Sequence, residues 1–403
     1  MLNELGELNF QISFLILLTF CISNNFALVL GNYLEDNYPK SVIEDAHLDT
    51  AQLIEKYKYP LETHYITTDD NYILCLHRIP KPQGPPVLFM HGLLDSSASW
   101  VIMGPKQAAA CYFFDNGYDV WLGNARGNRY SRNHTTLNPN SDDEFWTFSW
   151  HEIGYYDLPI MIDHILARTG FKKLGYFGHS QGTTAFWVLC SLQPQYNDKI
   201  TIMQALAPVA YLKHVRTPFV SQFYEFTKAS KDRVREFLPH NEMMLHMCFT
   251  SKIAENMCVQ FLNQMLGNDN GQTNLARYPV IVGHVPAGCN LKQFVHYLQL
   301  IESNRFCQYD YGREENIQRY NQSSPPDYPL EKITVPVGLH YAYNDYLNSH
   351  IDVKQLAETL PNVVLNNLYP YKDWNHVTMI WGKEARKLTQ EPMLKLLKKF
   401  PYE

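Results

Sequence analysis

The sequence has few cysteines and none of the common metal-binding motifs. Cysteine accounts for 8 of 403 residues, which is too few for a fold held together mainly by disulfides. Neither Cys-x-x-Cys nor His-Glu-x-x-His occurs, and these are spacings with which many zinc proteins bind their metal. We therefore expect no metal site and no other cofactor.

The sequence also has no block of basic residues, no internal repeat and no low-complexity tract. Its 34 Lys and Arg are outnumbered by 40 Asp and Glu, which gives a formal net charge of −6. Nucleic-acid-binding proteins usually concentrate positive charge, so a nucleic-acid partner is not expected. Hydrophobic residues make up 45% of the chain, which is enough for a large packed core.

Charge is absent from one long segment near the N-terminus, residues 8–34. Such an apolar segment predicts a secretory signal peptide, which we assign to residues 1–27. The preceding residues include Glu4 and Glu7 but no Lys or Arg, and the segment is long enough to cross a bilayer, so an uncleaved signal anchor is the alternative. No second segment of comparable apolarity follows. We therefore expect a secreted or lysosomal protein without a stable transmembrane anchor.

Two kinds of covalent modification would follow from secretion. Cys248 and Cys258 are the closest pair of cysteines in the sequence and would close a small loop in an oxidising lumen. With Cys21 in the signal peptide, seven cysteines remain, so at least one thiol stays unpaired. Asn133 and Asn321 begin Asn-x-Thr and Asn-x-Ser sequons and are candidate N-glycosylation sites.

Strand and helix patterns alternate along the first half of the chain. After a polar stretch at 28–49, two segments of period-2 hydrophobicity at 63–67 and 72–78 predict a β-hairpin. Short apolar runs typical of buried parallel strands lie at 85–94, 117–124, 174–182 and 200–210, with helical patterns at 156–168 and 183–193. This alternation predicts right-handed βαβ units and a mostly parallel sheet flanked by helices.

The alternation is interrupted once. Residues 211–329 are amphipathic and helical in pattern, and two strand patterns with a final helix follow within 330–403. The length alone would allow two or three domains. We predict one α/β core, built from 50–210 and 330–403, with 211–329 inserted as a helical cap and lid.

A possible nucleophile lies where one predicted strand meets a predicted helix. Gly178-His-Ser180-Gln-Gly182 matches the Gly-x-Ser-x-Gly nucleophile elbow, in which the two glycines permit a strained turn that exposes the serine hydroxyl. The pattern also occurs by chance in ordinary tight turns. The apolar strand before it and the helical pattern after it favour a nucleophilic Ser180.

A serine nucleophile needs a histidine base and a carboxylate that orients the base. In folds with this elbow, the acid and then the histidine follow the serine in the chain. Asp345 directly follows a late strand pattern, and His376 lies after the last one, so both are preferred. The other residues considered were Asp327, Asp352, Asp373, His296, His340 and His350.

The oxyanion of the reaction requires two backbone N–H donors. One usually belongs to the residue after the nucleophile and the other to the loop after an early strand. Gln181 and Leu93 occupy these positions. Gly92 precedes Leu93 and allows the loop to turn its amides inward, although His91-Gly92 would also suit a simple strand exit.

Seven blocks of sequence, in order, resemble the acid lipase family, which contains gastric lipase and lysosomal acid lipase. They are HGLLDSS at 91–97, GNARGNRYSRNH at 123–134, EFWTFSWHEIGYYDLPIMIDHI at 144–165, GHSQGTT at 178–184, ALAPVA at 205–210, GHVPAG at 283–288 and NHVTMIWG at 375–382. The resemblance implies an α/β-hydrolase fold with a helical cap and lid, and a catalytic triad at Ser180, Asp345 and His376. It also implies oxyanion donors at Leu93 and Gln181, and a cap disulfide where Cys248 and Cys258 lie.

Two positions depart from the family's pattern. Asp95 stands where many members have a small residue, and Cys289 stands where Thr or Ser is common. Either change would alter substrate preference without touching the triad.

The resemblance implies a lipase that hydrolyses triacylglycerol or cholesteryl esters at a lipid–water interface without a cofactor. Three alternatives share the fold: an esterase for more soluble or other esters, a catalytically silent protein that binds lipid, and a peptidase. The intact order of Ser, Asp and His disfavours the silent protein. The sequence makes no prediction about the oligomeric state.

Overall fold

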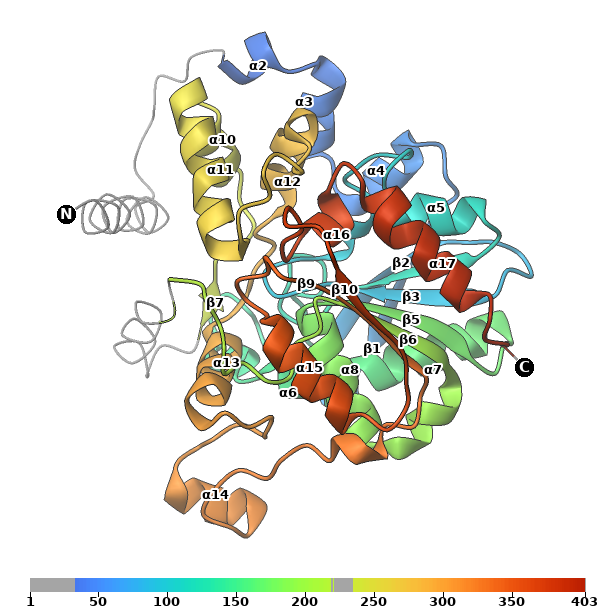
Figure 1. The fold of residues 1–403 in the computed structure, drawn as a ribbon, viewed down its shortest axis with the longest axis vertical. Helices are drawn as coiled ribbons and strands as arrows, with labels where there is room; N and C mark the ends of the chain where they lie inside the picture. The colour runs from blue at the N-terminus through green and yellow to red at the C-terminus, as the bar shows by residue number, and fades with distance from the viewer. Residues whose placement is uncertain (1–32, 219, 221–234, 403) are drawn as a thin grey trace, which may run out of the picture.

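The computed structural model describes residues 33–218, 220 and 235–402 (Figure 1). The signal peptide expected at 1–27 lies outside the described residues. A twisted sheet occupies the centre of the molecule, helices cover both of its faces, and α10, α11 and α12 project to one side beside α2 and α3 (Figure 1).

The main sheet has eight strands in the order β1-β2-β4-β3-β5-β6-β9-β10. Their bounds are β1 Glu62–Thr67, β2 Ile73–Ile79, β3 Pro86–Met90, β4 Asp119–Gly123, β5 Leu174–His179, β6 Ile200–Leu206, β9 Val337–Ala342 and β10 Val363–Tyr369. β1 pairs with β2, and β2 with β4, antiparallel; all the other pairs are parallel. The expected hairpin and the mostly parallel sheet are therefore confirmed.

The apolar amino-acid sequences of the central strands follow from their buried position. β3, β4, β5, β6 and β9 are buried along their whole length, so both of their faces need apolar side chains. The chain passes from β3 to β4 on one side and then returns to β5 on the other side of β3. The carboxyl ends of strands at such a reversal form the usual crevice for ligands in α/β sheets.

Two hydrophobic clusters hold helices onto the two faces of the sheet. One joins the sheet to α7 Leu158–Thr169, α8 Gln181–Leu192 and α15 His350–Thr359. The other joins it to α4 Thr50–Lys56, α5 Ala109–Asp115, α16 Thr378–Trp381 and α17 Glu391–Leu397. α7 has Pro159 in its first turn and ends at Gly170, whose φ of 77° suits a left-handed cap.

The chain between β6 and β9 is mainly helical. It contains α10 Met243–Cys248, α11 Lys252–Leu266, α12 Tyr278–His284, α13 Leu291–Ser303 and α14 Arg313–Tyr320, with a small ribbon of β7 Glu236–Phe237 and β8 Cys289–Asn290. A disulfide between Cys248 and Cys258 joins α10 to α11. The thiols of the other described cysteines, Cys75, Cys111, Cys190, Cys289 and Cys307, are free and buried.

Two short helices near the N-terminus were not expected. The stretch predicted only as polar contains α2 Tyr33–Asn37 and α3 Lys40–His47, and α3 packs against α12. The packing is close, because a Cβ on Gly283 would lie 2.3 Å from the carbonyl oxygen of Ala46. The N-terminal segment is thus part of the layer formed by α10 to α12.

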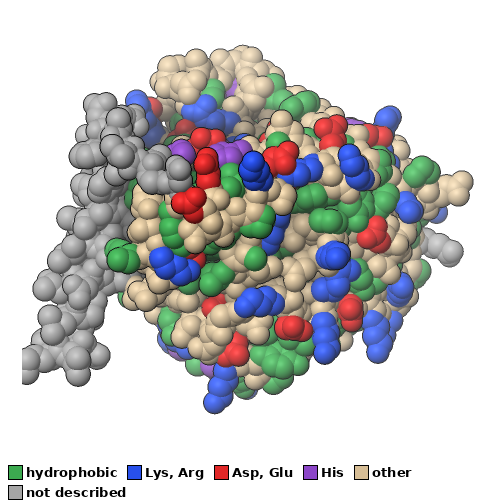
Figure 2. Space-filling model, turned by 90° about the horizontal axis from the view of Figure 1, so that it is seen from above, with side chains coloured by type: hydrophobic (Ala, Val, Ile, Leu, Met, Phe, Trp, Pro, Cys, Tyr) green, Lys and Arg blue, Asp and Glu red, His purple; other side chains and the backbone are tan. Residues whose placement is uncertain are grey.

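Shorter helical segments complete the connections. They are α6 Trp150–Glu152, η1 Ser97–Trp100, η2 Asp143–Trp146, η3 Ile153–Asp157, η4 Pro194–Lys199, η5 Leu275–Arg277, η6 Leu330–Lys332 and η7 Arg386–Gln390. None of the helices in the described ranges is long and apolar enough to span a bilayer. On the face seen in Figure 2, acidic and basic side chains are interspersed with apolar and polar ones rather than gathered by sign.

Candidate active site

Ser180 lies in a sharp turn between β5 and α8. Its φ of 52° and ψ of −117° are outside the regions that most side chains adopt. The turn requires both glycines, because a Cβ on Gly178 would lie 2.9 Å from the carbonyl of Gly182, and one on Gly182 would lie 2.5 Å from the carbonyl oxygen of Met90. This is the strained geometry of a nucleophile elbow.

Asp345 and His376 meet at the carboxyl end of the sheet. Nδ1 of His376 donates to Oδ2 of Asp345 over 2.8 Å, and both side chains are buried. The other oxygen, Oδ1, accepts the backbone N–H groups of Leu347 and Asn348 at 2.9 and 2.8 Å. Because Nδ1 carries the proton of the neutral ring, Nε2 is free to accept one.

Ser180 and His376 line the same cavity, whose volume is about 390 Å³. Leu93 lines it as well, and the loop that carries Leu93 approaches the serine closely, because a Cβ on Gly92 would lie 3.2 Å from Cβ of Ser180. Gln181 is the first residue of α8, and the first N–H groups of a helix have no partner within it. The structure thus brings Ser180, Asp345, His376, Leu93 and Gln181 to one end of the sheet.

A neutral histidine supports the loop of Leu93. Nε2 of His91 accepts hydrogen bonds from the backbone N–H of Ala125 and from Nδ2 of Asn128, both at 3.1 Å. Nδ1 therefore carries the proton and donates to the carbonyl of Gly92 at 2.8 Å. Burial lowers the pKa of His91 to about 4, so the ring stays neutral and keeps both roles in mildly acidic solution.

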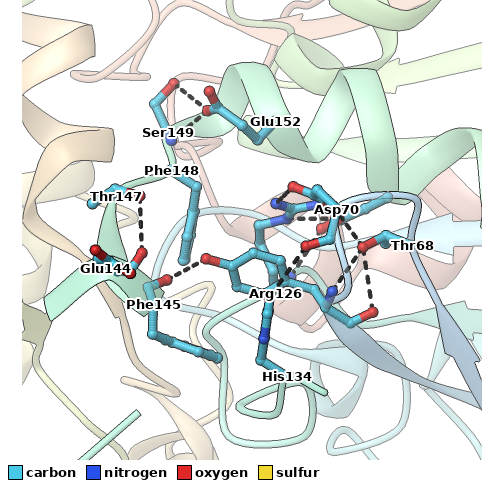
Figure 3. Close-up of polar contacts among 12 residues, drawn as sticks. Thr68, Asp70, Arg126, His134, Glu144, Phe145, Thr147, Phe148, Ser149 and Glu152 are labelled. Atoms are coloured by element: carbon cyan, nitrogen blue, oxygen red, sulfur yellow. Dashed lines mark hydrogen bonds and ion pairs between the residues drawn. The ribbon is translucent and has the colours of Figure 1, made fainter. Parts of the chain in front are cut away.

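The loop after β4 is itself anchored by Arg126, as Figure 3 shows. The guanidinium is fully buried and contacts Asp70 on one side, at 2.5 and 2.9 Å, and Asp157 on the other, at 2.6 and 2.7 Å. Burial alone would lower the pKa of Arg126, but the two carboxylates outweigh it and raise that pKa. Tyr72 lies under the guanidinium, 4.1 Å from its carbon to the ring centre, and bonds to the carbonyl of Phe145.

A second histidine links the elbow to His376. Nε2 of His179 donates to the backbone carbonyl of His376 at 2.8 Å. Burial, with the nearby His376 ring, lowers the pKa of His179 to about 3. Sequence reasoning missed His179, Asn128 and Arg126, although all three lie in blocks that resemble the acid lipases.

The other acids and histidines considered lie elsewhere. Asp327 and Asp352 pair with Arg305 and His214, and Asp373 accepts from Asn270. His296 stacks on Trp150, His340 bonds to Gln204, and the ring of His350 contacts that of Tyr343. None of these six lines the cavity.

The predicted modification sites have distinct surroundings. Asn133 and Asn321 are both exposed, while Cys248 and Cys258 line the cavity. Within the described ranges, no group of three His, Cys, Asp or Glu side chains is arranged to hold a metal ion.

Comparisons with known proteins agree with this geometry. Residues 85–383 match the family described as alpha/beta hydrolase fold, and residues 50–104 match a partial alpha/beta-hydrolase lipase region. The chain is 45% identical to Lipase 1 of Drosophila melanogaster, over 90% of this chain and 82% of the relative. It is 36% identical to gastric triacylglycerol lipase of Bos taurus, over 88% and 92%. The structure of naproxen esterase from Bacillus subtilis is similar in fold, with a TM-score of 0.50 at 14% identity, over 87% of this chain and 99% of that one.

Proposed function

Because the chain belongs to the acid lipase family of α/β hydrolases, we propose that this lipase hydrolyses carboxylic esters of neutral lipids with Ser180 as the nucleophile. The observation that carries the proposal is the cavity in which Ser180 and the Asp345-paired His376 meet. Triacylglycerols and cholesteryl esters are the substrates that fit this chemistry.

The reaction proceeds by two acyl transfers. His376 takes the proton of Ser180 through Nε2, and the serine oxygen attacks the ester carbonyl. The N–H groups of Leu93 and Gln181 stabilise the oxyanion, while Asp345 orients and stabilises the imidazolium. The proton passes to the leaving alcohol as the carbon–oxygen bond breaks, and water activated by His376 then releases the fatty acid.

The lining of the cavity supports a long apolar substrate. Side chains from α10 and α11 form part of the wall, and side chains from α13 form another part. They include Met244, Phe261, Leu262, Met265, Phe294, Tyr297, Leu298 and Ile301. Pockets with few polar groups select apolar ligands, so an acyl chain is better matched to this cavity than a peptide.

The residues from 211 to 329 act as the cap of this site in the proposal, and residues 50–210 with 330–403 form its catalytic core. The disulfide between α10 and α11 supports a secreted or lysosomal protein, because disulfides persist in oxidising compartments. Its partner is the surface of a lipid droplet or micelle, and Asn133 and Asn321 are proposed glycosylation sites.

The first test is fatty-acid release from emulsified triolein, compared with release from soluble tributyrin, by the purified protein and by Ser180→Ala. We expect the variant to lose more than about a thousandfold in kcat/KM and to keep its fold, because only residual oxyanion stabilisation is left. Ser191→Ala is the matched control, since Ser191 is a buried serine of α8 that bonds to the carbonyl of Val188.

Each alternative gives a different result. Hydrolysis of dissolved tributyrin with no hydrolysis of emulsified triolein would indicate an esterase for soluble esters, whereas a preference for tributyrin alone would show only a preference for short acyl chains. Lipid binding without ester hydrolysis by the unaltered protein would indicate the silent lipid-binding relative. Equal turnover by Ser180→Ala and the unaltered protein would reject Ser180 as the nucleophile.

A further inference from the structure

A carboxyl group that the mechanism does not use lies in the wall of the substrate cavity. Asp95 is two residues beyond Leu93, lines the cavity and is only 5% exposed. It stands where the sequence departs from the pattern of the acid lipases. A charged carboxylate in a dry apolar cavity is unfavourable unless a cation or several hydrogen bonds compensate it.

The hydrogen bonds to Asp95 are few and come from neutral donors. Oδ1 accepts the N–H of Ser96 at 2.7 Å, and Oδ2 accepts the hydroxyl of Ser99. Asn128 reaches only the backbone carbonyl of Asp95, at 3.4 Å. From the segment before α13, Ala287 donates to the carbonyl of Leu94 and not to the side chain of Asp95.

Within the described ranges, the titratable groups on the neighbouring elements do not supply a cation. His91 at the end of β3 and His179 at the end of β5 are both kept neutral by burial, which lowers their pKa values. His376, after β10, is paired with Asp345. On the loop after β4, Arg126 is held by two other carboxylates, as described above.

The other two basic side chains of that loop also face elsewhere, and Arg132 pairs with Glu236 at 2.8 Å. Arg129 lies over the ring of Tyr130, 4.9 Å from the ring centre, and its Nη1 is 3.5 Å from His240. On the side of β2, His77 bonds to Ser97, and burial lowers the pKa of that histidine to about 4. Burial raises the pKa of Asp95 to about 7, and the bonds from Ser99 and Ser96 only partly oppose this rise.

We propose that Asp95 is a specificity-determining residue of the ester-hydrolysis site and that the enzyme hydrolyses neutral lipid esters only when Asp95 is uncharged. The inference rests on the proposed function. An ionised Asp95 places a negative charge beside the loop that stabilises the oxyanion, so it disfavours the negatively charged transition state. It also makes the wall of the cavity polar where the substrate is apolar. Turnover of neutral esters therefore falls on the alkaline side as Asp95 loses its proton.

The test is the pH profile of kcat/KM for Asp95→Asn, which has nearly the same shape but stays neutral. Near pH 5 we expect the variant to be within about threefold of the unaltered enzyme. Near pH 8.5 the unaltered enzyme retains about one thirtieth of its acid-side kcat/KM, whereas the variant retains about a third or more. An unchanged alkaline limb in Asp95→Asn would overturn the proposal.

Ser99→Ala provides a graded second variant outside the cavity. Removing its hydroxyl leaves Asp95 with one donor fewer, so the alkaline limb moves to higher pH while the acid-side kcat/KM stays within about threefold. A limb that moved to lower pH, or did not move, would contradict the role of Asp95.

An unfolding measurement separates this inference from the proposed function. The pKa of Asp95 is raised above its usual value of 3.8, so the folded protein binds the proton more tightly than the unfolded chain between about pH 4 and about pH 7. The contribution of Asp95 to stability therefore decreases as the pH rises through that range, and this contribution is absent in Asp95→Asn. If the unaltered protein hydrolyses no ester at any pH, the proposed function fails. If it hydrolyses esters but Asp95→Asn shows the same dependence of stability on pH, only the inference fails.

Discussion

At the scale of single residues, the geometry of the proposed site depends on imidazoles outside the proposed triad. His179 joins the strand of the nucleophile to the loop of the proposed base, because its Nε2 donates to the carbonyl of His376 at 2.8 Å. The low pKa of His179, about 3, keeps the ring uncharged in acid, and the bond to the carbonyl fixes the tautomer that has its proton on Nε2. His179 is therefore a positioning residue in this arrangement, and its effect on catalysis passes through His376.

The variant His179→Phe tests this role by keeping a ring and removing the donor. We expect kcat to fall about tenfold with little change in KM, because the base is misplaced and substrate binding is not. The unfolding free energy should fall by about 1 to 3 kcal/mol, since the carbonyl of His376 loses a buried partner. His164→Phe, on α7 and outside the cavity lining, is the matched control and should leave kcat unchanged. A kcat for His179→Phe equal to that of the unaltered enzyme would contradict the prediction.

The sequence indicates the residues that we propose to react more readily than those that surround them. Ser180, Asp345 and His376 follow strands in a fixed order, so their positions in the chain carried enough information. The supporting residues His91, Asn128 and Asp95 act through a tautomer, a hydrogen bond or the loss of water. Such properties depend on which side chains come into contact across three strands. These contacts cannot be predicted from the order of the residues along the chain.

At the scale of elements, the loop after β4 is fixed by one buried ion pair network. Arg126 contacts Asp70, just before β2 (Figure 3). On its other side it contacts Asp157, at the end of η3. The same loop carries Asn124 and Asn128, whose side chains contact Ser97 and His91. Arg126 thereby connects the hairpin, the helices before α7 and the loop of Leu93.

Replacing Arg126 with Met should leave the buried carboxylate of Asp157 and the partly exposed one of Asp70 without their cation. We expect the unfolding free energy to fall by about 3 to 5 kcal/mol. Arg319→Met is the matched control, because Arg319 forms an exposed pair with Glu315 on α14, and such pairs contribute about 0.5 kcal/mol. Urea unfolding of both variants gives the comparison. Equal losses of unfolding free energy in the two variants would show that the network around Arg126 contributes no more to stability than an exposed ion pair does.

Elements were predicted where hydrophobic pattern alone determines them. The buried strands are continuous apolar runs, and they were found. α2, α3 and α15 were missed because few of their residues are buried and the rest are polar. The order of the strands was also beyond the sequence, since the position of β4 between β2 and β3 depends on how the connections cross the sheet.

At the scale of the whole molecule, buried histidines make stability depend on pH. Burial lowers the pKa of four of them to about 4, and they are spread over the core: His77, His91, His284 and His340. In the unfolded chain each has a pKa near 6.5. The unfolded state therefore binds more protons between about pH 6.5 and about pH 4, so stability is fully present above pH 6.5 and decreases as the pH falls through that range. Asp95 and Asp157 act in the opposite direction over much of the same range, because burial raises their pKa values to about 7 and about 6, but they are two groups against four.

We therefore expect the unfolding free energy, measured in urea, to decrease from about pH 7 to about pH 4. His340→Gln tests the cause, because Gln can still donate to Gln204, the partner of His340 at 3.2 Å, but takes up no proton. The decrease should be smaller in this variant by about 3 kcal/mol or less, which is the contribution of one histidine shifted from 6.5 to 4. His246→Gln is the control, since the side chain of His246 is 47% exposed and is solvated in both states. If His340→Gln loses as much stability in acid as the unaltered protein does, the buried histidines do not cause the dependence of stability on pH. The protonation of carboxylates would then cause it.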